Sequence, residues 1–112
     1  MTQNIAFSEL QHEPQSGLYY RRATNSEVPR ARLLLLHGVG GNESNLAGLA
    51  RFLPPALDLI LLRAPLQIAP QGFAWFQVNF TSTGPVIQAD QAEASRNRLL
   101  SFIQSQPQMP TV

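Results

Sequence analysis

The residues with the clearest chemical potential are three glycines that follow a run of leucines. Gly38, Gly40 and Gly41 stand in the segment LLLLHGVGGNESNL, residues 33–46. Glycine allows positive φ and close backbone approach, so amide N–H groups in such a turn can point outward at the end of a strand. Two chemistries use this arrangement. One is phosphate binding at a helix N-terminus, and the other is stabilisation of the oxyanion formed when a nucleophile attacks an ester carbonyl.

The glycine spacing favours the oxyanion over the phosphate. Neither G-x-x-x-x-G-K-[S/T] nor G-x-G-x-x-G fits glycines at positions 38, 40 and 41, and the chain has no lysine. A serine nucleophile would need a G-x-S-x-G elbow, followed along the chain by an acid and a histidine. We predict no catalytic residue in this chain, because no serine has glycine two residues before and two after it; the serines are at 8, 16, 26, 44, 82, 95, 101 and 105.

Composition argues against several other classes of protein. The chain has no cysteine, and His12 and His37 are too few to build a zinc site alone. The formal net charge is +1 and the arginines are scattered, which does not indicate nucleic-acid binding. The apolar run at residues 33–36 is far too short to span a membrane. We therefore expect a soluble, cytoplasmic domain with no metal, no cofactor, no nucleic-acid partner and no membrane span.

The apolar pattern predicts strands before and after the glycine turn. Residues 5–10 and 18–23 are typical of an antiparallel strand pair, and residues 31–37 (ARLLLLH) indicate a buried central strand. Asn42 or Ser44 could cap a following helix, and Pro54 would end it. Residues 57–62 (LDLILL) then complete a β-α-β unit.

The second half predicts a loop and a helix. Residues 64–85 contain proline, glycine and an aromatic cluster, so we expect a long ordered loop. Residues 88–106 predict an amphipathic helix, with a capping box of Asp90 and Glu93. Thr111 and Val112 come where the alternation requires another strand.

The string H-G-V-G-G-N after an all-leucine strand, followed by APLQIAP and FAWF, resembles the phospholipase/carboxylesterase family of α/β-hydrolases. That family includes small bacterial esterases and acyl-protein thioesterases, and the resemblance covers residues 33–103. It implies an α/β protein with an incomplete α/β-hydrolase fold. Residues 1–112 would be one partial domain, with an N-terminal antiparallel strand pair followed by parallel β-α-β-α units and ending before the nucleophile elbow.

The resemblance also implies roles for individual residues. The backbone amide of Val39, flanked by Gly38 and Gly40, would form the oxyanion hole, and Trp75 and Phe76 would line the acyl pocket. Further positions that match the family are Arg63, Ala64 and Pro65, while Gln77 stands where the family commonly has an acid. His37 is expected to be structural, because the catalytic histidine of this fold follows the nucleophile in the chain.

The implied function is that of an N-terminal fragment of a serine carboxylesterase, which would cleave an ester or thioester substrate once a C-terminal half completes it. The isolated chain should be inactive, because nucleophile, acid and catalytic histidine are absent. An alternative is a non-catalytic ligand-binding or interaction module on a truncated hydrolase fold. The edge of the strand at residues 33–36 would then be open for self-association.

Overall fold

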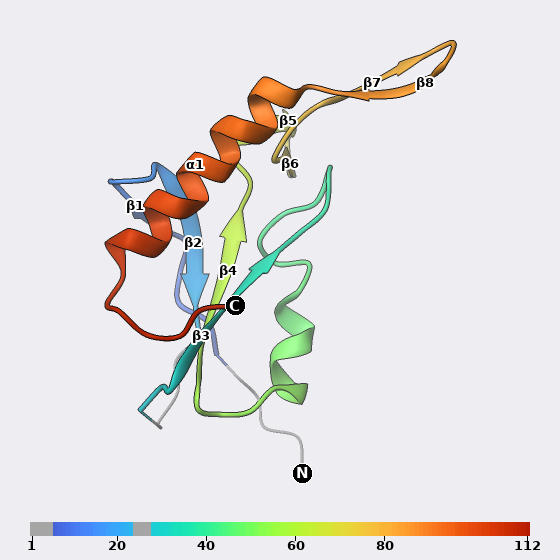
Figure 1. Ribbon diagram of the computed structural model, residues 1–112. Helices are drawn as coiled ribbons and strands as arrows, with labels where there is room; N and C mark the ends of the chain where they lie inside the picture. The colour runs from blue at the N-terminus through green and yellow to red at the C-terminus, as the bar shows by residue number, and fades with distance from the viewer. Residues whose placement is uncertain (1–5, 24–27) are drawn as a thin grey trace.

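A computed structural model of the protein describes residues 6–23 and 28–112 (Figure 1). Within these ranges the chain forms eight strands, one α-helix and one short 3₁₀ helix. The strands are β1 Gln11–Glu13, β2 Leu18–Arg22, β3 Ala31–Leu36, β4 Leu57–Arg63, β5 Leu66–Ala69, β6 Gly72–Ala74, β7 Val78–Thr81 and β8 Gly84–Ile87. The 3₁₀ helix η1 is Ala47–Phe52 and the α-helix α1 is Ala89–Ser105.

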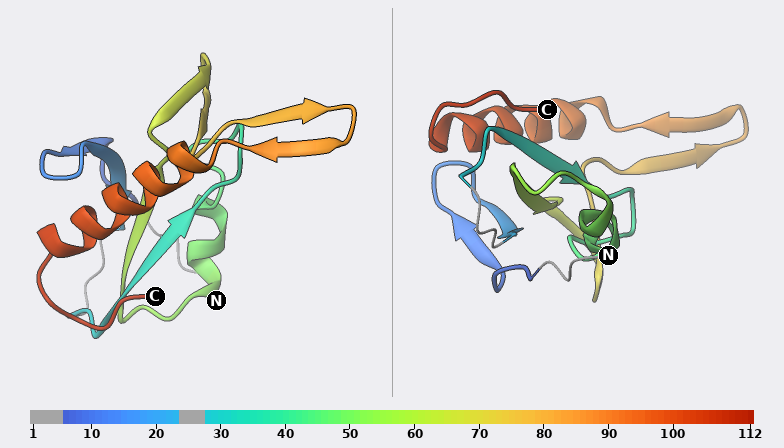
Figure 2. Two further views of the ribbon diagram at one scale, coloured as in Figure 1. Left: turned by 45° about the horizontal axis from the view of Figure 1, so that its top comes forward. Right: turned by 90° about the horizontal axis from the view of Figure 1, so that it is seen from below.

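The central sheet has the strand order β1-β2-β4-β3, and only β3 and β4 run parallel. Strands β5 and β6 form a separate hairpin, as do β7 and β8. Figure 2 shows the β7–β8 hairpin projecting away from the sheet, while α1 lies across one face of it. Strands make up 39% and helices 22% of the described residues. The expected parallel β-α-β-α arrangement of an α/β-hydrolase is therefore wrong.

One reason lies in the segment predicted to be a loop, residues 64–85, which forms β5, β6, β7 and the first half of β8. Its proline and glycine residues lie in and around two antiparallel hairpins, β5–β6 and β7–β8, and do not make the whole segment a loop. In the β7–β8 hairpin, the Thr81 hydroxyl donates a hydrogen bond to the Gly84 carbonyl at 2.7 Å, and Gly84 has φ +119°. Positive φ at this position suits glycine, so the turn closes without strain.

A second reason is the helix predicted after the glycine turn, which is only the six-residue η1. Side-chain bonds fold the preceding residues into a turn, because Asn42 N–H donates to Asn45 Oδ1 at 2.7 Å and Ser44 N–H donates to Asn42 Oδ1 at 3.0 Å. Gly48 then weakens any helix, and Pro54 stops it. The expected α-helical crossover is thus replaced by a turn and η1.

The N-terminal strands differ in position from the prediction. The antiparallel partner of β2 is Gln11–Glu13 and not residues 5–10, from which Phe7 makes an isolated bridge to Ala23. Residue 5 lies outside the described residues. The turn between β1 and β2 includes Gly17 at φ +75°. A short, tightly connected β1 therefore flanks β2.

The core lies between the sheet and α1. It combines side chains from β2, β4, β6, α1 and the residues directly after β4 and β6: Leu18, Ile60, Leu62, Ala64, Phe73, Trp75 and Phe102. The prediction of a helix at residues 88–106 is confirmed to within one residue at each end. The expected capping box is wrong, because no side chain caps this helix and Glu93 pairs with Arg96 at 2.9 Å.

Candidate functional site

The glycine turn at residues 38–41 follows β3 directly and is fixed by β6. The Gly40 N–H donates to the Phe73 carbonyl at 2.9 Å, and the Phe73 N–H donates to the Gly41 carbonyl at 2.8 Å. Gly40 has φ +84°, a conformation that L side chains rarely adopt. Two backbone hydrogen bonds therefore hold this turn in one shape.

The N–H groups of the turn differ in their availability. The Gly40 N–H is bonded to Phe73, but no described residue hydrogen-bonds to the N–H of Gly38 or Val39. Both of these residues are exposed, and Val39 is 53% exposed. Of the three residues assigned to the oxyanion hole, two thus present free donors at the end of β3, and the third supports the turn.

His37 joins the turn to the neighbouring strand. Its Nε2 accepts a hydrogen bond from the Ala64 N–H at 3.0 Å, and its Nδ1 lies 2.7 Å from the Gly38 carbonyl oxygen. The ring is 5% exposed. Both nitrogens are occupied, with Nδ1 placed as the donor, so the ring has no free nitrogen for accepting a proton from a nucleophile. This arrangement is the structural role expected from the sequence.

Trp75 and Phe76 lie together at an apolar pocket beside the turn. Trp75 is 9% exposed, and its indole N–H donates to the His37 carbonyl at 3.0 Å. The pocket has a volume of about 290 Å³. Its lining comes from the end of β3, the segment after β6 and one side of α1: Leu36, Trp75, Phe76, Ala92, Ser95, Arg96 and Leu99.

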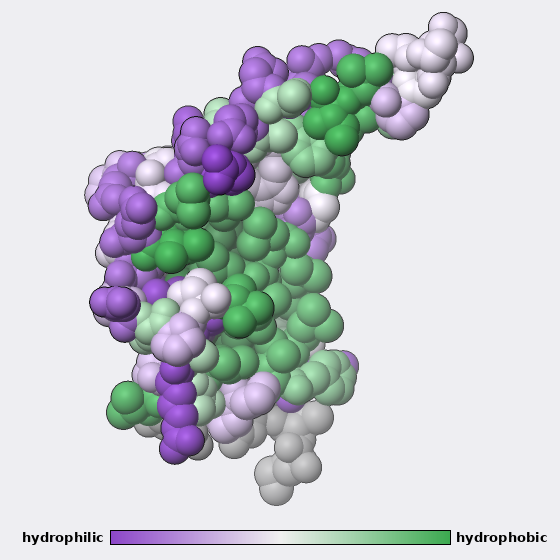
Figure 3. Space-filling model, in the orientation of Figure 1, coloured by the Kyte–Doolittle hydropathy of each residue, from purple (hydrophilic) through white to green (hydrophobic). Residues whose placement is uncertain are grey.

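The pocket and the turn are linked through the end of β3 and through Trp75, and no residue of the turn itself lines the pocket. Leu36 lines the pocket and Gly38 begins the free N–H pair, with His37 between them hydrogen-bonded to Trp75. Figure 3 shows hydrophobic side chains gathered on this face, over β3 and the adjoining part of α1. An apolar pocket next to two free donors can hold a molecule that has a polar carbonyl and an apolar chain.

Gln77 does not take part in the pocket. Its backbone N–H donates a hydrogen bond to Gln91 Oε1 at 2.8 Å, and the side-chain amide of Gln91 donates to Gln77 Oε1 at 3.0 Å. This exposed reciprocal pair attaches the segment after β6 to α1. The position at which the resemblance led us to expect an acid thus holds a glutamine that makes an anchoring contact.

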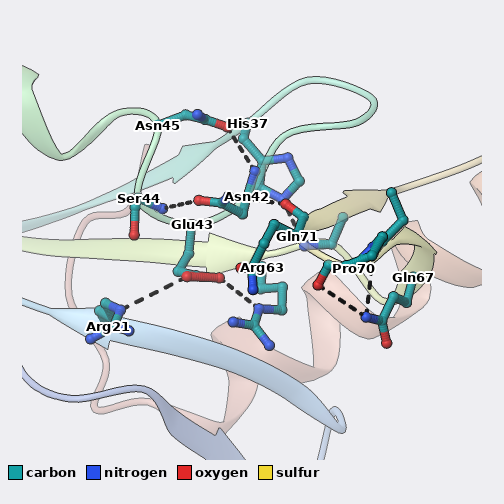
Figure 4. Close-up of polar contacts among 12 residues, drawn as sticks. Arg21, His37, Asn42, Glu43, Ser44, Asn45, Arg63, Gln67, Pro70 and Gln71 are labelled. Carbon is teal, nitrogen blue, oxygen red and sulfur yellow. Dashed lines mark hydrogen bonds and ion pairs between the residues drawn. The ribbon is translucent and has the colours of Figure 1, made fainter.

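An ion cluster around the buried carboxylate of Glu43 was missed by the sequence reasoning. Glu43 is 5% exposed, Arg63 Nε donates to its Oε1 at 2.6 Å, and Arg21 Nε lies 3.9 Å from its Oε2 (Figure 4). Burial acts to raise the pKa of Glu43, but the hydrogen bond from Arg63 and the charges of both arginines outweigh it and lower this pKa. The only sequence signal was an acid next to a glycine turn.

Other kinds of site are not formed by the described residues. No group of three histidine, aspartate or glutamate side chains among them could hold a metal ion. No helix in residues 6–23 and 28–112 is long and apolar enough to cross a membrane.

No protein-family model, no curated protein and no solved structure matches this chain. The case for a function therefore rests on the site itself, and above all on the free N–H pair beside the apolar pocket.

Proposed function

We propose that this chain supplies the oxyanion-binding and acyl-binding parts of a carboxylic ester or thioester hydrolase. The observation that carries the proposal is the pair of free N–H groups at Gly38 and Val39, next to the apolar pocket at Trp75. The nucleophile, the acid and the catalytic histidine would come from a C-terminal half outside this chain. The proposed setting is the cytoplasm.

The chemistry follows from what each part could stabilise. When a nucleophile attacks an ester, the carbonyl oxygen gains negative charge, and fixed N–H donors lower the energy of that state. Loss of one such donor typically costs about 10²–10³ in kcat. The hydrogen bonds from Gly40 and Phe73 support the proposal, because donors that are already fixed need no reorganisation during the reaction.

The pocket would select the acyl group. Its volume of about 290 Å³ and its apolar lining suit a short acyl chain. Trp75 is held by its bond to His37, so its ring can form one wall without further ordering. Short-chain esters and thioesters are therefore the proposed substrates.

Binding can be followed through Trp75, which is the only tryptophan in the chain. Methyl butylphosphonate carries a tetrahedral anion and a four-carbon chain, and it should change the indole fluorescence saturably. Methyl methylphosphonate should bind about tenfold or more weakly, because three methylene groups are lost at about 0.8 kcal/mol each. Equal affinity for both compounds would contradict the acyl-pocket assignment.

Matched variants sharpen this titration. Phe76→Ala removes a pocket wall and should weaken binding of the butyl compound, whereas Phe80→Ala changes a side chain that is 86% exposed and lies outside the pocket. The Phe80 variant should bind as the parent does. If both variants behave alike, the compound binds somewhere other than this pocket.

The absence of a nucleophile has its own assay. The purified chain should not hydrolyse p-nitrophenyl butyrate above the buffer rate, and a fluorophosphonate probe should label no serine. Adding the C-terminal half should produce both hydrolysis of the ester and labelling of a serine by the probe. A labelled serine in the isolated chain would contradict the proposal, since it would reveal an activated nucleophile.

A second candidate function is self-association through the edge of β3. The observation that favours it is that the backbone of this edge is only partly hydrogen-bonded by the described residues. Residues 110–112 pair with the first part of this edge, with Leu34 N–H donating to the Val112 carbonyl at 2.9 Å. No described residue is bonded in this way to Leu36 N–H, which points to the same side by strand alternation. A second copy could pair there, because unpaired strand edges accept further strands.

A further inference from the structure

We propose a second binding site, for a small aromatic carboxylate, in a cavity beside Arg63. The cavity has a volume of about 300 Å³ and lies between the start of β2, the end of β4 and the β5–β6 hairpin. Its walls include Tyr19, Arg63, Ala64, Pro65, Gln67 and Phe73. It shares no lining residue with the pocket at Trp75, so this inference does not depend on the proposed hydrolase function.

The first argument is the hydrogen bonding of Arg63. Its Nε is engaged by Glu43 at 2.6 Å, whereas no described residue hydrogen-bonds to either of its Nη atoms. Figure 4 shows these terminal nitrogens on the side of the guanidinium away from Glu43. A guanidinium fixed through Nε still offers donors in a planar arrangement, and this geometry matches a carboxylate.

The second argument is charge. Glu43 serves both Arg63 and Arg21, so two partly exposed guanidinium groups surround one buried carboxylate, a net charge of one positive unit. Arg98 adds a further cation at the edge of the cavity, since its Nη1 lies 3.0 Å from the position that a Cβ on Gly17 would take. An anion entering the cavity would offset this excess positive charge.

The third argument is the aromatic wall. The Arg63 guanidinium carbon lies 4.4 Å from the Phe73 ring centre and 5.9 Å from the Tyr19 ring centre. These contacts restrain the guanidinium and place apolar surface beside it. The volume is at the lower end of the range for small-molecule sites. A single aromatic ring bearing a carboxylate therefore fits both the charge and the walls.

Titration of the ¹⁵N-labelled chain with benzoate tests the proposal. Benzoate should shift the backbone amide resonances of Tyr19, Gln67 and Phe73 saturably. Benzamide has the same shape without the charge and should bind about tenfold or more weakly, because charge-assisted bonds are roughly twice as strong as neutral ones. The absence of saturable shifts at these residues, or equal affinity for both compounds, would overturn it.

Variants separate the site from general attraction to arginine. Arg63→Lys keeps the charge but loses the planar donors, and should weaken benzoate binding about tenfold. Arg96→Lys changes an exposed arginine that is 62% accessible and pairs with Glu93, and it should leave affinity unchanged. Affinity retained in Arg63→Lys would overturn the proposal.

A further variant covers the case in which Arg63→Lys fails to fold. Tyr19→Ser removes a wall that is 44% exposed and keeps the Glu43 cluster intact. Benzoate binding should weaken about twofold or more in a chain whose other resonances are unchanged, because the contact between the two aromatic rings is lost. Unchanged affinity in that folded variant would count against the site.

Discussion

Strands β3 and β4 are parallel neighbours with nearly the same apolar composition, yet they differ in burial. Leu59, Ile60, Leu61 and Leu62 of β4 are at most 2% exposed, whereas Leu36 of β3 is 40% exposed. Strand β4 lies between β2 and β3, while the outer edge of β3 has backbone hydrogen bonds, among the described residues, to residues 110–112 alone. An apolar run therefore specifies a strand without specifying whether it lies at the centre or the edge of the sheet.

The two strands also differ in what their ends provide. The exposed end of β3 leads into the free N–H groups of Gly38 and Val39. The buried β4 ends instead at Arg63, which is fixed by Glu43. Both proposed sites thus lie at the same end of the parallel pair, and Phe73 of β6 contacts both, through its backbone at the glycine turn and through its ring at Arg63.

The largest expected effect comes from the contact that joins the two strands. Arg32 of β3 is 2% exposed and lies opposite Asp58 of β4, with Nε 2.9 Å from Oδ2. Asp58→Ala should destabilise the protein by about 3–5 kcal/mol, because it leaves a buried charge without its partner. Urea unfolding measures this loss. Asp90→Ala, at an exposed position, should cost under about 1 kcal/mol, and equal losses would refute the role of the pair.

A direct comparison of leucines in the two strands should give the next largest difference. Leu62→Ala in β4 should cost about 2–5 kcal/mol, because a fully buried side chain leaves a cavity. Leu36→Ala in β3 should cost about 1 kcal/mol, since much of this side chain is already in solvent. Urea denaturation of both variants measures the difference. Similar losses would show that the edge of β3 is covered.

The acid dependence of stability should report on the Glu43 cluster beside β4. The lowered pKa of Glu43 means that the unfolded chain binds more protons near the ordinary value of 4.5. The stabilisation of the folded protein by ionised Glu43 is therefore fully present above pH 4.5 and is lost as the pH falls through the lower pKa of the folded state. Glu43→Gln should lose about 1–3 kcal/mol at neutral pH and show a shallower decline in acid.

The measurement for Glu43 is the melting temperature of parent and variant between neutral and acidic pH. Glu9→Gln is the control, because Glu9 is exposed and its side chain makes no ion pair with any described residue. The control should follow the parent curve closely. Parallel curves for the parent and Glu43→Gln would contradict the assignment of this acid dependence to the cluster.

The smallest expected effect on stability comes from Leu36→Lys at the edge of β3. Because the aliphatic stem of lysine can keep most of the apolar contact that the partly exposed leucine makes, the change should alter the unfolding free energy by less than about 0.5 kcal/mol. It should nevertheless abolish any concentration-dependent self-association, since charged side chains oppose edge pairing. Sedimentation velocity over a range of concentrations detects this. Association that persists in Leu36→Lys would place the contact elsewhere.

Local periodicity predicted the elements whose own residues determine them. The helix α1 was found from the spacing of its apolar residues, and the strands at residues 31–37 and 57–62 from their short apolar runs. The expectation that residues 31–37 form a buried central strand was wrong, because β3 lies at the edge of the sheet. The glycine turn was found because three closely spaced glycines specify backbone freedom locally. Each of these signals lies within a single segment of the chain.

Contacts between distant segments could not be predicted in this way. The hairpins at residues 64–85 have the same proline and glycine content as a loop, and only their pairing makes them strands. The cluster of Glu43, Arg63 and Arg21 joins residues from three elements, so no local pattern indicated it. The helix predicted after the turn was lost to side-chain bonds from Asn42 and Asn45.

The most direct test of the central claim is an NMR titration of the ¹⁵N-labelled chain with methyl butylphosphonate. The account predicts that the backbone amide resonances of Gly38 and Val39 shift downfield together with the indole N–H of Trp75, all with one dissociation constant. The Gly40 amide is bonded to Phe73 and should move less. Indole shifts without any change at Gly38 and Val39 would contradict an oxyanion site and leave only an apolar pocket.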